Sequence, residues 1–369
     1  MNLFETSREF HAKAQRRKVT REALHGVNVF ALTTRGLEGV AAAEMAVLPG
    51  VCVRDIAYRR VTAACSGDLA PLLGLRTVDD VFLDVAMWNG LTRQRDALSR
   101  FRQQAARLDL RSAAVLRPLR PQSSVLSPQS FSLTVNFVGK RNYTTDEIKQ
   151  ICAEAIIARH DWMYTPDDEA ADLNVRLFIE HETAVVGVRL GMRPLHRRAY
   201  KQEHVLGSLK PPVAAALLRL AGVQPGMCVL DPCCGAGTIL VEATAAGMYA
   251  IGGDVAVEAL CAARTNVEAA GVGLSLRRWD ARRLPLAAAS VDAVISNPPW
   301  GRAVDVTADL ADFYRALCAE IRRVLKPGGK AALLTGVPEL VQLPNLRLQT
   351  RLEISLFGQQ PEILVFSAD

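Results

Sequence analysis

The sequence predicts an α/β protein in which a Rossmann-like, mostly parallel sheet occupies the C-terminal half and smaller α+β units occupy the N-terminal half. The main observation is the alternation of apolar, strand-like segments with helical segments after residue 212. Such alternation is typical of a parallel sheet with helices on both faces. A second observation is that strands and helices follow a different order before residue 193. With 369 residues, the chain is long enough for two or three domains.

The N-terminal half is expected to begin with a basic extension over residues 1–26 and to continue with a ferredoxin-like domain over residues 27–94. The segments of this domain follow the order strand, helix, strand, strand, helix, strand, which is the βαββαβ order of that fold. Residues 95–192 are expected to form a second α+β domain. Its predicted elements are an amphipathic helix over 95–110, a loop over 113–130, a strand over 131–138, a helix over 144–160 capped by Thr144 or Thr145, and a strand hairpin over 171–189.

A basic linker over residues 193–212 is expected to join the two halves. Its positive side chains could contact the phosphates of a nucleic acid, because such contacts are made mainly by Lys and Arg. The alternative is that these charges are only solvated. The net charge of +6 is consistent with a polyanionic partner. The candidate phosphate contacts are Arg193, Arg197, Arg198, Lys201 and Lys210.

The C-terminal half, expected to form a domain over residues 213–369, carries the sequence CVLDPCCGAGTILVEA at residues 228–243. We expect an apolar strand that ends at Asp231, a turn through Gly235 and Gly237, and a helix. The glycines let the backbone pass close to a ligand and leave the N-terminus of the helix facing it. The third glycine of the dinucleotide-binding fingerprint is missing, and a carboxylate at Asp231 would repel a pyrophosphate. The pattern therefore favours a cationic or amine-bearing ligand such as S-adenosylmethionine.

Further acids follow at the ends of the next strands. Asp254 ends a strand expected over 249–254, where an acid can accept hydrogen bonds from ribose hydroxyls. Asp280 follows a strand expected over 275–279 and could meet an adenine amine. Ligands of open α/β sheets bind at the carboxyl ends of the strands. The candidate residues for binding the ligand are Asp231, Cys233, Gly235, Gly237, Thr238, Asp254, Asp280 and Asn297.

A second motif, Asn-Pro-Pro-Trp, follows a strand expected over 291–296. Pro298 ends this strand, because proline cannot donate to a strand ladder. The amide oxygen of Asn297 and the carbonyl of Pro298 can then accept both hydrogens of one –NH2 group, while Trp300 offers a flat face to a nucleobase. The alternative interpretation is a Pro-Pro loop with a structural tryptophan. The candidate catalytic residues are Asn297, Pro298, Pro299 and Trp300.

The two motifs, DPCCGAGT and NPPW, resemble those of the class I S-adenosylmethionine-dependent methyltransferases that modify exocyclic amines of nucleobases. The resemblance covers residues 205–369 and includes LKPGGKAALLTG at residues 325–336. It implies a seven-stranded sheet in which a strand over 330–335 is followed by a closing antiparallel pair.

Residues 131–199 resemble the THUMP RNA-binding domain, so we assign residues 95–192 to such a domain. A THUMP domain followed by this catalytic domain resembles the tRNA guanine-N2 methyltransferases. The resemblance implies S-adenosylmethionine as the cofactor and tRNA as the partner. It also implies that a guanosine in the acceptor-stem region is flipped out of its helix and methylated directly on N2.

Several other functions stay open. The Asn-Pro-Pro-Trp geometry also suits an adenine-N6 or cytosine-N4 methyltransferase, and the THUMP resemblance favours RNA over DNA without choosing the base. An rRNA guanine-N2 methyltransferase is another alternative, and a non-catalytic RNA-binding protein is the alternative from a different class. A NAD-dependent dehydrogenase is disfavoured by Asp231 and by the missing third glycine.

Composition argues against several further classes. The eight cysteines include no CxxC pair, so no metal site is expected and a reducing compartment is favoured. No apolar run approaches the ~18 residues of a membrane-spanning helix. Residues 1–25 lack the apolar core of a signal peptide. We therefore expect a cytoplasmic monomer with no membrane partner.

Overall fold

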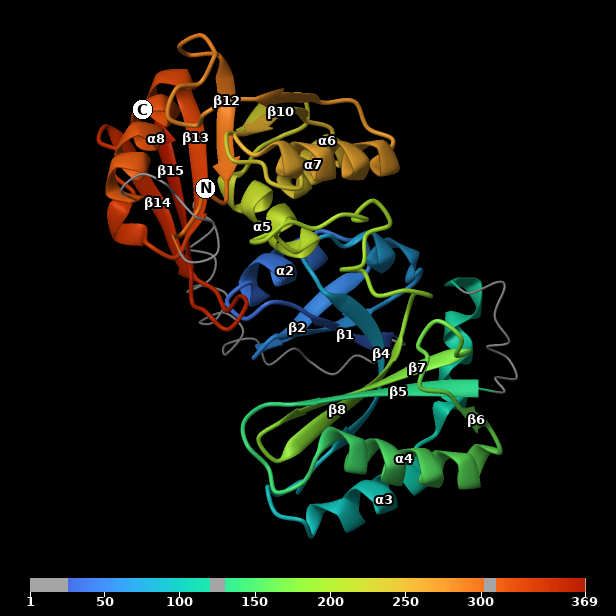
Figure 1. Ribbon diagram of the computed structural model, residues 1–369. Coiled ribbons are helices and arrows are strands. Elements are labelled where there is room, and N and C mark those ends of the chain that lie inside the picture. Colours follow the sequence, from blue (N-terminus) through green and yellow to red (C-terminus); the bar gives the residue numbers. More distant parts are fainter. Residues whose placement is uncertain (1–25, 120–129, 302–309, 369) are drawn as a thin grey trace. The chain divides into compact units, whose positions relative to one another are not determined.

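Two compact units make up the protein in the computed structural model, which describes residues 26–119, 130–301 and 310–368 (Figure 1). The first unit contains the described residues up to 31 together with 42–74 and 81–192, and the second contains residues 32–41, 75–80 and 193 onward. The basic extension predicted over residues 1–26 falls almost entirely outside the described residues, as do residues 120–129 of the predicted loop. Across the described ranges no helix is both long enough and apolar enough to cross a bilayer.

The first unit is built on one eight-stranded sheet, with the strand order β2-β3-β1-β4-β8-β7-β5-β6. Strands predicted for the ferredoxin-like domain and strands predicted for the THUMP domain meet within it, because β4 pairs with β8 in antiparallel fashion. The domain boundary at residue 94 stays a prediction. In chain order the elements are β1 (Val27–Leu32), α2 (Glu38–Met45), β2 (Val51–Ala57), β3 (Arg60–Cys65), η1 (Ala70–Gly74), β4 (Asp80–Trp88), α3 (Ala97–Arg107), η2 (Leu110–Leu119), β5 (Ser130–Phe137), α4 (Thr145–His160), β6 (Met163–Tyr164), β7 (Leu173–Glu180) and β8 (Thr183–Arg189).

Local sequence signals set the ends of some of these elements. α4 begins after Thr144, whose hydroxyl accepts a hydrogen bond from the Glu147 amide at 3.2 Å, while the Glu147 carboxylate accepts one from the Thr144 amide at 2.8 Å. This capping box satisfies two backbone donors of the helix start, and it selects Thr144 from the two predicted caps, Thr144 and Thr145. The first part of the loop predicted over 113–130 is instead occupied by the 3-10 helix η2, in which Ala113 and Leu116 are buried.

The second unit is built on a seven-stranded sheet with the order β11-β10-β9-β12-β13-β15-β14. Strands β9 to β13 pair in parallel, and β15 runs antiparallel to both β13 and β14. The predicted Rossmann-like fold with a closing antiparallel pair is therefore confirmed. In chain order the elements are α5 (Pro211–Ala221), β9 (Cys228–Asp231), α6 (Thr238–Ala245), β10 (Tyr249–Asp254), α7 (Val257–Ala270), β11 (Ser275–Arg278), β12 (Val291–Ser296), α8 (Leu310–Val324), β13 (Leu325–Thr335), η3 (Pro338–Leu340), β14 (Leu346–Glu353) and β15 (Glu362–Ala368).

Alternate residues of this sheet supply two hydrophobic cores, one on each face. Val229, Ala293 and Leu334 pack with residues of α5, α6 and α7. Their sequence neighbours Leu230, Val294 and Leu333 pack with residues of α8. This period of two follows from the pleat of a strand that is covered on both faces. The carboxyl ends of the parallel strands therefore meet along one edge of a rigid, buried sheet.

Two short segments from the N-terminal half, residues 32–41 and 75–80, belong to the second unit. Leu37 and Val40 pack into the core that contains α5. The Ser355 amide donates a hydrogen bond to the Arg35 carbonyl at 3.0 Å. The folding of the C-terminal half therefore uses residues that lie far upstream in the sequence.

Candidate active site

The glycine-rich turn between β9 and α6 has the backbone geometry that its sequence predicts. Gly235 and Gly237 have φ angles of +51° and +75°, in the left-handed region that glycine adopts without strain. A Cβ atom on Gly237 would also lie 3.2 Å from the Cβ of Ala263 in α7. The turn is therefore tight, and α7 packs directly against it.

Asp254, at the end of β10, orders this turn. One of its carboxylate oxygens accepts a hydrogen bond from the Gly235 amide at 3.0 Å, and the other accepts one from the Ala256 amide at 3.0 Å. The contact is possible because β10 is the parallel neighbour of β9, with Gly252 paired to Asp231. The residue predicted to accept hydrogen bonds from ribose hydroxyls thus also shapes the loop.

Asp231 is buried at the end of β9. Its Oδ1 atom accepts hydrogen bonds from the Ser296 hydroxyl at 2.6 Å and from the Cys233 amide at 3.2 Å. Burial raises the pKa of this carboxyl to about 7, although both hydrogen bonds favour the charged form. The carboxyl therefore titrates near neutral pH, and a cationic ligand beside it would favour the anionic form.

The three predicted acids converge around Cys233. Burial, together with the carboxylates of Asp231, Asp254 and Asp280, raises the pKa of the Cys233 thiol well above its ordinary value. The neutral form of the thiol is therefore favoured. The Asp280 carboxylate is itself paired with the Arg282 guanidinium at 2.7 Å, so it already has a partner.

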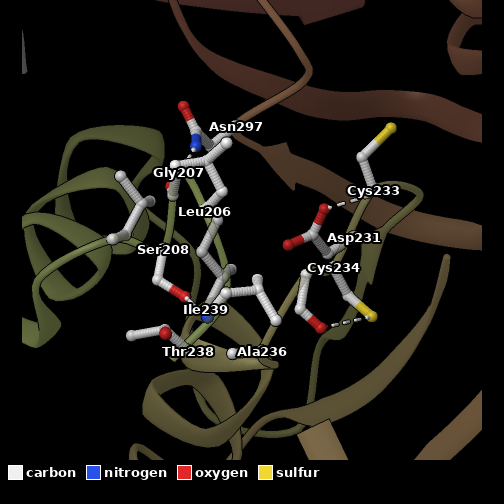
Figure 2. A pocket seen from close by; sticks show the side chains of 13 residues that line it. Leu206, Gly207, Ser208, Asp231, Cys233, Cys234, Ala236, Thr238, Ile239 and Asn297 are labelled. Carbon is white, nitrogen blue, oxygen red and sulfur yellow. Dashed lines mark hydrogen bonds between the residues drawn. The ribbon is translucent and has the colours of Figure 1, made fainter. Parts of the chain in front are cut away.

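The glycine-rich turn forms one wall of a pocket at the carboxyl end of β9 (Figure 2). The other wall consists of residues 205–209, which lie within the predicted linker. Among the predicted residues, those that line the pocket are Asp231, Cys233, Gly235, Thr238 and Asn297. The remaining ones, which are not part of its lining, are Gly237, Asp254, Asp280, Pro298, Pro299 and Trp300. Within the described ranges no three His, Cys, Asp or Glu side chains gather as metal ligands would.

Asn297 presents a polar atom that is buried without a partner. Its Nδ2 atom donates a hydrogen bond to the Gly207 carbonyl at 3.3 Å, and Figure 2 shows the amide nitrogen turned toward Gly207. The Oδ1 atom is buried and accepts no hydrogen bond from any described residue. A buried acceptor left in this state costs about 1–3 kcal/mol. The site therefore has an unused acceptor that a ligand N–H group could satisfy.

The rest of the Asn-Pro-Pro-Trp corner is held by the protein. The Pro299 carbonyl accepts a hydrogen bond from the Tyr314 hydroxyl at 3.1 Å, and the same hydroxyl lies 2.7 Å from the Thr335 Oγ1 atom. The Trp300 indole N–H donates to the Leu334 carbonyl at 3.3 Å. The half-buried Trp300 ring also lies against Gly336, where a Cβ atom would come within 3.1 Å of it. The corner is therefore rigidly attached to the end of β13.

Two of the predicted phosphate contacts are turned inward. The Arg198 guanidinium donates to the Arg76 carbonyl at 3.0 Å and lies 3.5 Å from the Glu242 carboxylate. The Lys201 ammonium donates a hydrogen bond to the Thr238 hydroxyl, and burial lowers the pKa of Lys201 to about 8. The other three candidates, Arg193, Arg197 and Lys210, are exposed.

Several residues that build the site were not found from the sequence. Asn266 and Glu242 are buried polar residues that hold the segment before the pocket wall, while Ser296 and Tyr314 fix Asp231 and Pro299. Glu242 lies within the 228–243 stretch, but the pattern of that stretch did not mark it, and each of the four acts through a partner outside its own helix or strand. A buried polar residue in a helix that is otherwise apolar on that side is the only sequence signal that could have pointed to Asn266.

Known proteins that are similar to this chain are methyltransferases. A family model described as an RMKL-like methyltransferase domain matches residues 198–351. The chain is 34% identical over 246 residues to a tRNA (guanine(6)-N2)-methyltransferase of Thermus thermophilus, a match that covers 64% of this chain and 72% of that protein. It is 31% identical over 198 residues to the U6 snRNA (guanine-N(2))-methyltransferase THUMPD2 of Bos taurus, which covers 53% of this chain and only 38% of that protein.

A similar fold extends over nearly the whole chain. The crystal structure of TrmN from Thermus thermophilus matches with a TM-score of 0.75 and 30% identity, covering 93% of this chain and 100% of that one. The matched family domain includes both the glycine-rich turn and the Asn-Pro-Pro-Trp corner. From these similarities and the site geometry, the chain belongs to the family of RNA guanine-N2 methyltransferases.

Proposed function

We propose that this protein methylates the exocyclic N2 of a guanosine in tRNA, with S-adenosylmethionine as the methyl donor. The observation that carries the proposal is Asn297, which lines the same pocket as Asp231 and the glycine-rich turn and has a buried, unpartnered Oδ1 atom. An amide acceptor and a carboxyl in the lining of one pocket suit an amine that faces a cationic donor.

The donor side of the site is formed by the turn and the acids around it. When bound, S-adenosylmethionine supplies an electrophilic methyl group on a sulfonium. Asp231 would face the positive part of this molecule, and the open backbone at Gly235 leaves room for close approach. Asp254 would accept hydrogen bonds from the ribose, and the adenine would lie toward Asp280. The raised pKa of Asp231 fits a site that becomes anionic when a cation arrives.

The acceptor side is formed by the Asn-Pro-Pro-Trp corner. Asn297 Oδ1 and the Pro298 carbonyl would accept the two hydrogens of the guanine N2 amine and turn its lone pair toward the methyl group. The N–C bond forms as the S–C bond breaks, the bonding electron pair stays on sulfur, and the proton that N2 loses passes to water. Orientation of this kind can lower a barrier by up to about 7–11 kcal/mol in ideal cases. Trp300 would stack on the flipped base, a contact worth roughly 1–3 kcal/mol.

The choice of tRNA rests on relatives rather than on the pocket. The Thermus thermophilus protein, which is 34% identical, is named as a methyltransferase of guanine 6 in tRNA. We propose the same nucleotide as the target here. The bovine relative is named for U6 snRNA and is matched over a smaller share of its length. Of the predicted phosphate contacts, the exposed Arg193, Arg197 and Lys210 remain our candidates, while Arg198 and Lys201 are better explained as parts of the fold.

The test is methylation in vitro with nucleoside analysis. Purified protein is incubated with labelled S-adenosylmethionine and unmodified tRNA, and the digested nucleosides are separated by mass spectrometry. We expect N2-methylguanosine at one position. N6-methyladenosine as the product, or no transfer to tRNA but transfer to another RNA, would contradict the proposal.

The variant that tests the role of Asn297 in the same assay is Asn297→Ala. We expect its turnover to fall by at least about a hundredfold, as when one preorganised hydrogen-bonding group is removed from an active site. Its donor affinity, measured by titration calorimetry, should stay close to that of the wild type. Normal turnover in this variant would disprove the orienting role of Asn297.

A further inference from the structure

Residues 200–209, which we call the strap, lead from the beginning of the C-terminal segment of the second unit to the pocket. The first residues of the strap are fixed to helices α6 and α7, and the last ones form the pocket wall that faces the glycine-rich turn. The first part of the strap, residues 200–203, therefore anchors the segment, and the last part, residues 205–209, contacts the pocket.

The first anchor is α6, the helix that follows the glycine-rich turn. Lys201 donates a hydrogen bond to the hydroxyl of Thr238, the first residue of α6, which itself lines the pocket. One turn further along the same helix, the Glu242 carboxylate accepts a hydrogen bond from the Tyr200 hydroxyl at 2.8 Å. Residues four apart lie on the same face of a helix, so the strap follows that face.

The second anchor is Asn266 of α7, whose side chain is completely buried. Its Oδ1 atom accepts hydrogen bonds from the amides of Gln202 and Glu203, both at 2.9 Å. Its Nδ2 atom donates to the Glu203 carbonyl at 3.0 Å and to the Ala236 carbonyl at 2.9 Å. One amide group therefore joins the strap to the glycine-rich turn, in addition to the Lys201–Thr238 contact.

The far end of the strap reaches the Asn-Pro-Pro-Trp corner. The Gly207 carbonyl accepts the hydrogen bond from Asn297 Nδ2 at 3.3 Å (Figure 2). An amide group has one donor end and one acceptor end. The carbonyl therefore selects the side-chain orientation in which Nδ2 faces the strap and Oδ1 remains for a ligand. Gly207 has a φ angle of +78°, so the direction of this carbonyl depends on a left-handed backbone.

We propose that the strap is a positioning element for methyl transfer: Lys201 and Asn266 hold it against the donor turn, and the Gly207 carbonyl orients Asn297 toward the acceptor amine. The expected effect of the strap on turnover rests on the proposed function. Its expected effect on donor affinity depends only on how the two walls of the pocket are held. Lys201, Asn266 and Gly207 act through other residues and are positioning residues.

The first experiment tests the orientation of Asn297 with two variants of similar size, Gly207→Val and Gly207→Asn. A Cβ atom at this position meets no atom within 4 Å, so neither substitution creates a clash at Cβ, and the two variants differ in how well they adopt the left-handed backbone. Asn tolerates the left-handed region, whereas a β-branched residue does not. We expect the turnover number at saturating donor and RNA to be about tenfold lower in Gly207→Val than in Gly207→Asn. Equal turnover in the two variants would overturn this part of the proposal.

The second experiment tests the anchors with Lys201→Met and Asn266→Asp. The first replaces the ammonium with an apolar chain of similar length. The second keeps the acceptor for the Gln202 and Glu203 amides but loses both bonds that Nδ2 donates. We expect the Kd for S-adenosylmethionine, measured by titration calorimetry, to rise about five- to tenfold in each, because the loss of one or two hydrogen bonds is of that order.

Two control variants make the same chemical changes away from the strap. Lys149→Met removes an ammonium in the first unit, and Gln224→Glu adds a carboxylate at an exposed position. Both should bind the donor as the wild type does. Donor affinity in Lys201→Met that equals that of Lys149→Met would overturn the anchor, and this comparison remains decisive if Asn266→Asp does not fold. Absence of methyl transfer in the wild type would instead defeat the proposed function, while the donor titrations would still decide the anchors.

Discussion

The buried carboxylate of Glu242 is predicted to stabilise the second unit by several kilocalories per mole. Its side chain is 0% exposed and accepts hydrogen bonds from Arg76 Nε at 2.8 Å, Arg76 Nη2 at 2.6 Å and the Tyr200 hydroxyl at 2.8 Å. The Arg198 guanidinium lies 3.5 Å from the oxygen that Tyr200 contacts. Burial and the neighbouring carboxylate raise the pKa of Tyr200, so the phenol keeps its proton and donates it. Glu242→Gln would leave two guanidinium groups around a neutral amide.

The magnitude follows from the burial of the partners. Removing one member of a buried ion pair costs about 3–5 kcal/mol when the other stays buried and charged. The Arg198 side chain is 14% exposed, but that of Arg76 is 33% exposed and can turn toward water. We therefore expect the free energy of unfolding to fall by about 2–4 kcal/mol. At about 2–4 °C per kcal/mol for a unit of this size, the melting temperature should fall by roughly 5–15 °C.

Calorimetry combined with hydrogen exchange of the α6 amides would measure the loss in the second unit alone. The control is Asp312→Asn, which removes the carboxylate of an ion pair with Arg315. Both side chains are exposed, that of Arg315 by 75% and that of Asp312 by 61%. This change should cost less than about 1 kcal/mol. If Glu242→Gln costs no more than the control, the two guanidinium groups do not need the carboxylate, and the reasoning from burial fails.

Two further predictions concern the pocket. Because burial raises the pKa of Asp231 to about 7, its carboxyl is protonated below that pH, and the anion that a cationic donor favours forms as the pH rises. The Kd for S-adenosylmethionine should therefore decrease between about pH 6 and pH 8, by at most about tenfold per pH unit, and calorimetric titrations should show no such dependence in Asp231→Asn. Trp300→Ala should lower kcat/KM for RNA by about 5- to 150-fold, because base stacking is worth roughly 1–3 kcal/mol. The same variant should bind the donor normally, and unchanged kcat/KM would show that Trp300 has only a structural role against Gly336 and Leu334.

Much of the fold could be predicted because its signals are local. The alternation of apolar segments placed β10, β11 and β12 closely, whereas β13 begins at Leu325, before the strand predicted over 330–335, and the closing pair was implied by the family resemblance. Thr144 was one of the two residues predicted to cap α4. The glycines of the donor turn and the prolines after β12 act through their own backbone, so short motifs were sufficient to locate them. Placement of Asp231 and Asn297 at strand ends then brought them to one edge of the sheet, since parallel strands share their carboxyl ends.

Only the tertiary structure decided which partners the polar side chains take. Arg198 and Lys201 were predicted as phosphate contacts from their charge, because the sequence does not show that Glu242 and Thr238 lie beside them. Arg76 reaches Glu242 across 166 residues of chain. Such pairs depend on which helices pack against which strands, and no local pattern carries that information. The sequence alone therefore determined the chemistry at the end of each strand, and the packing of distant segments determined the pocket wall and the orientation of Asn297.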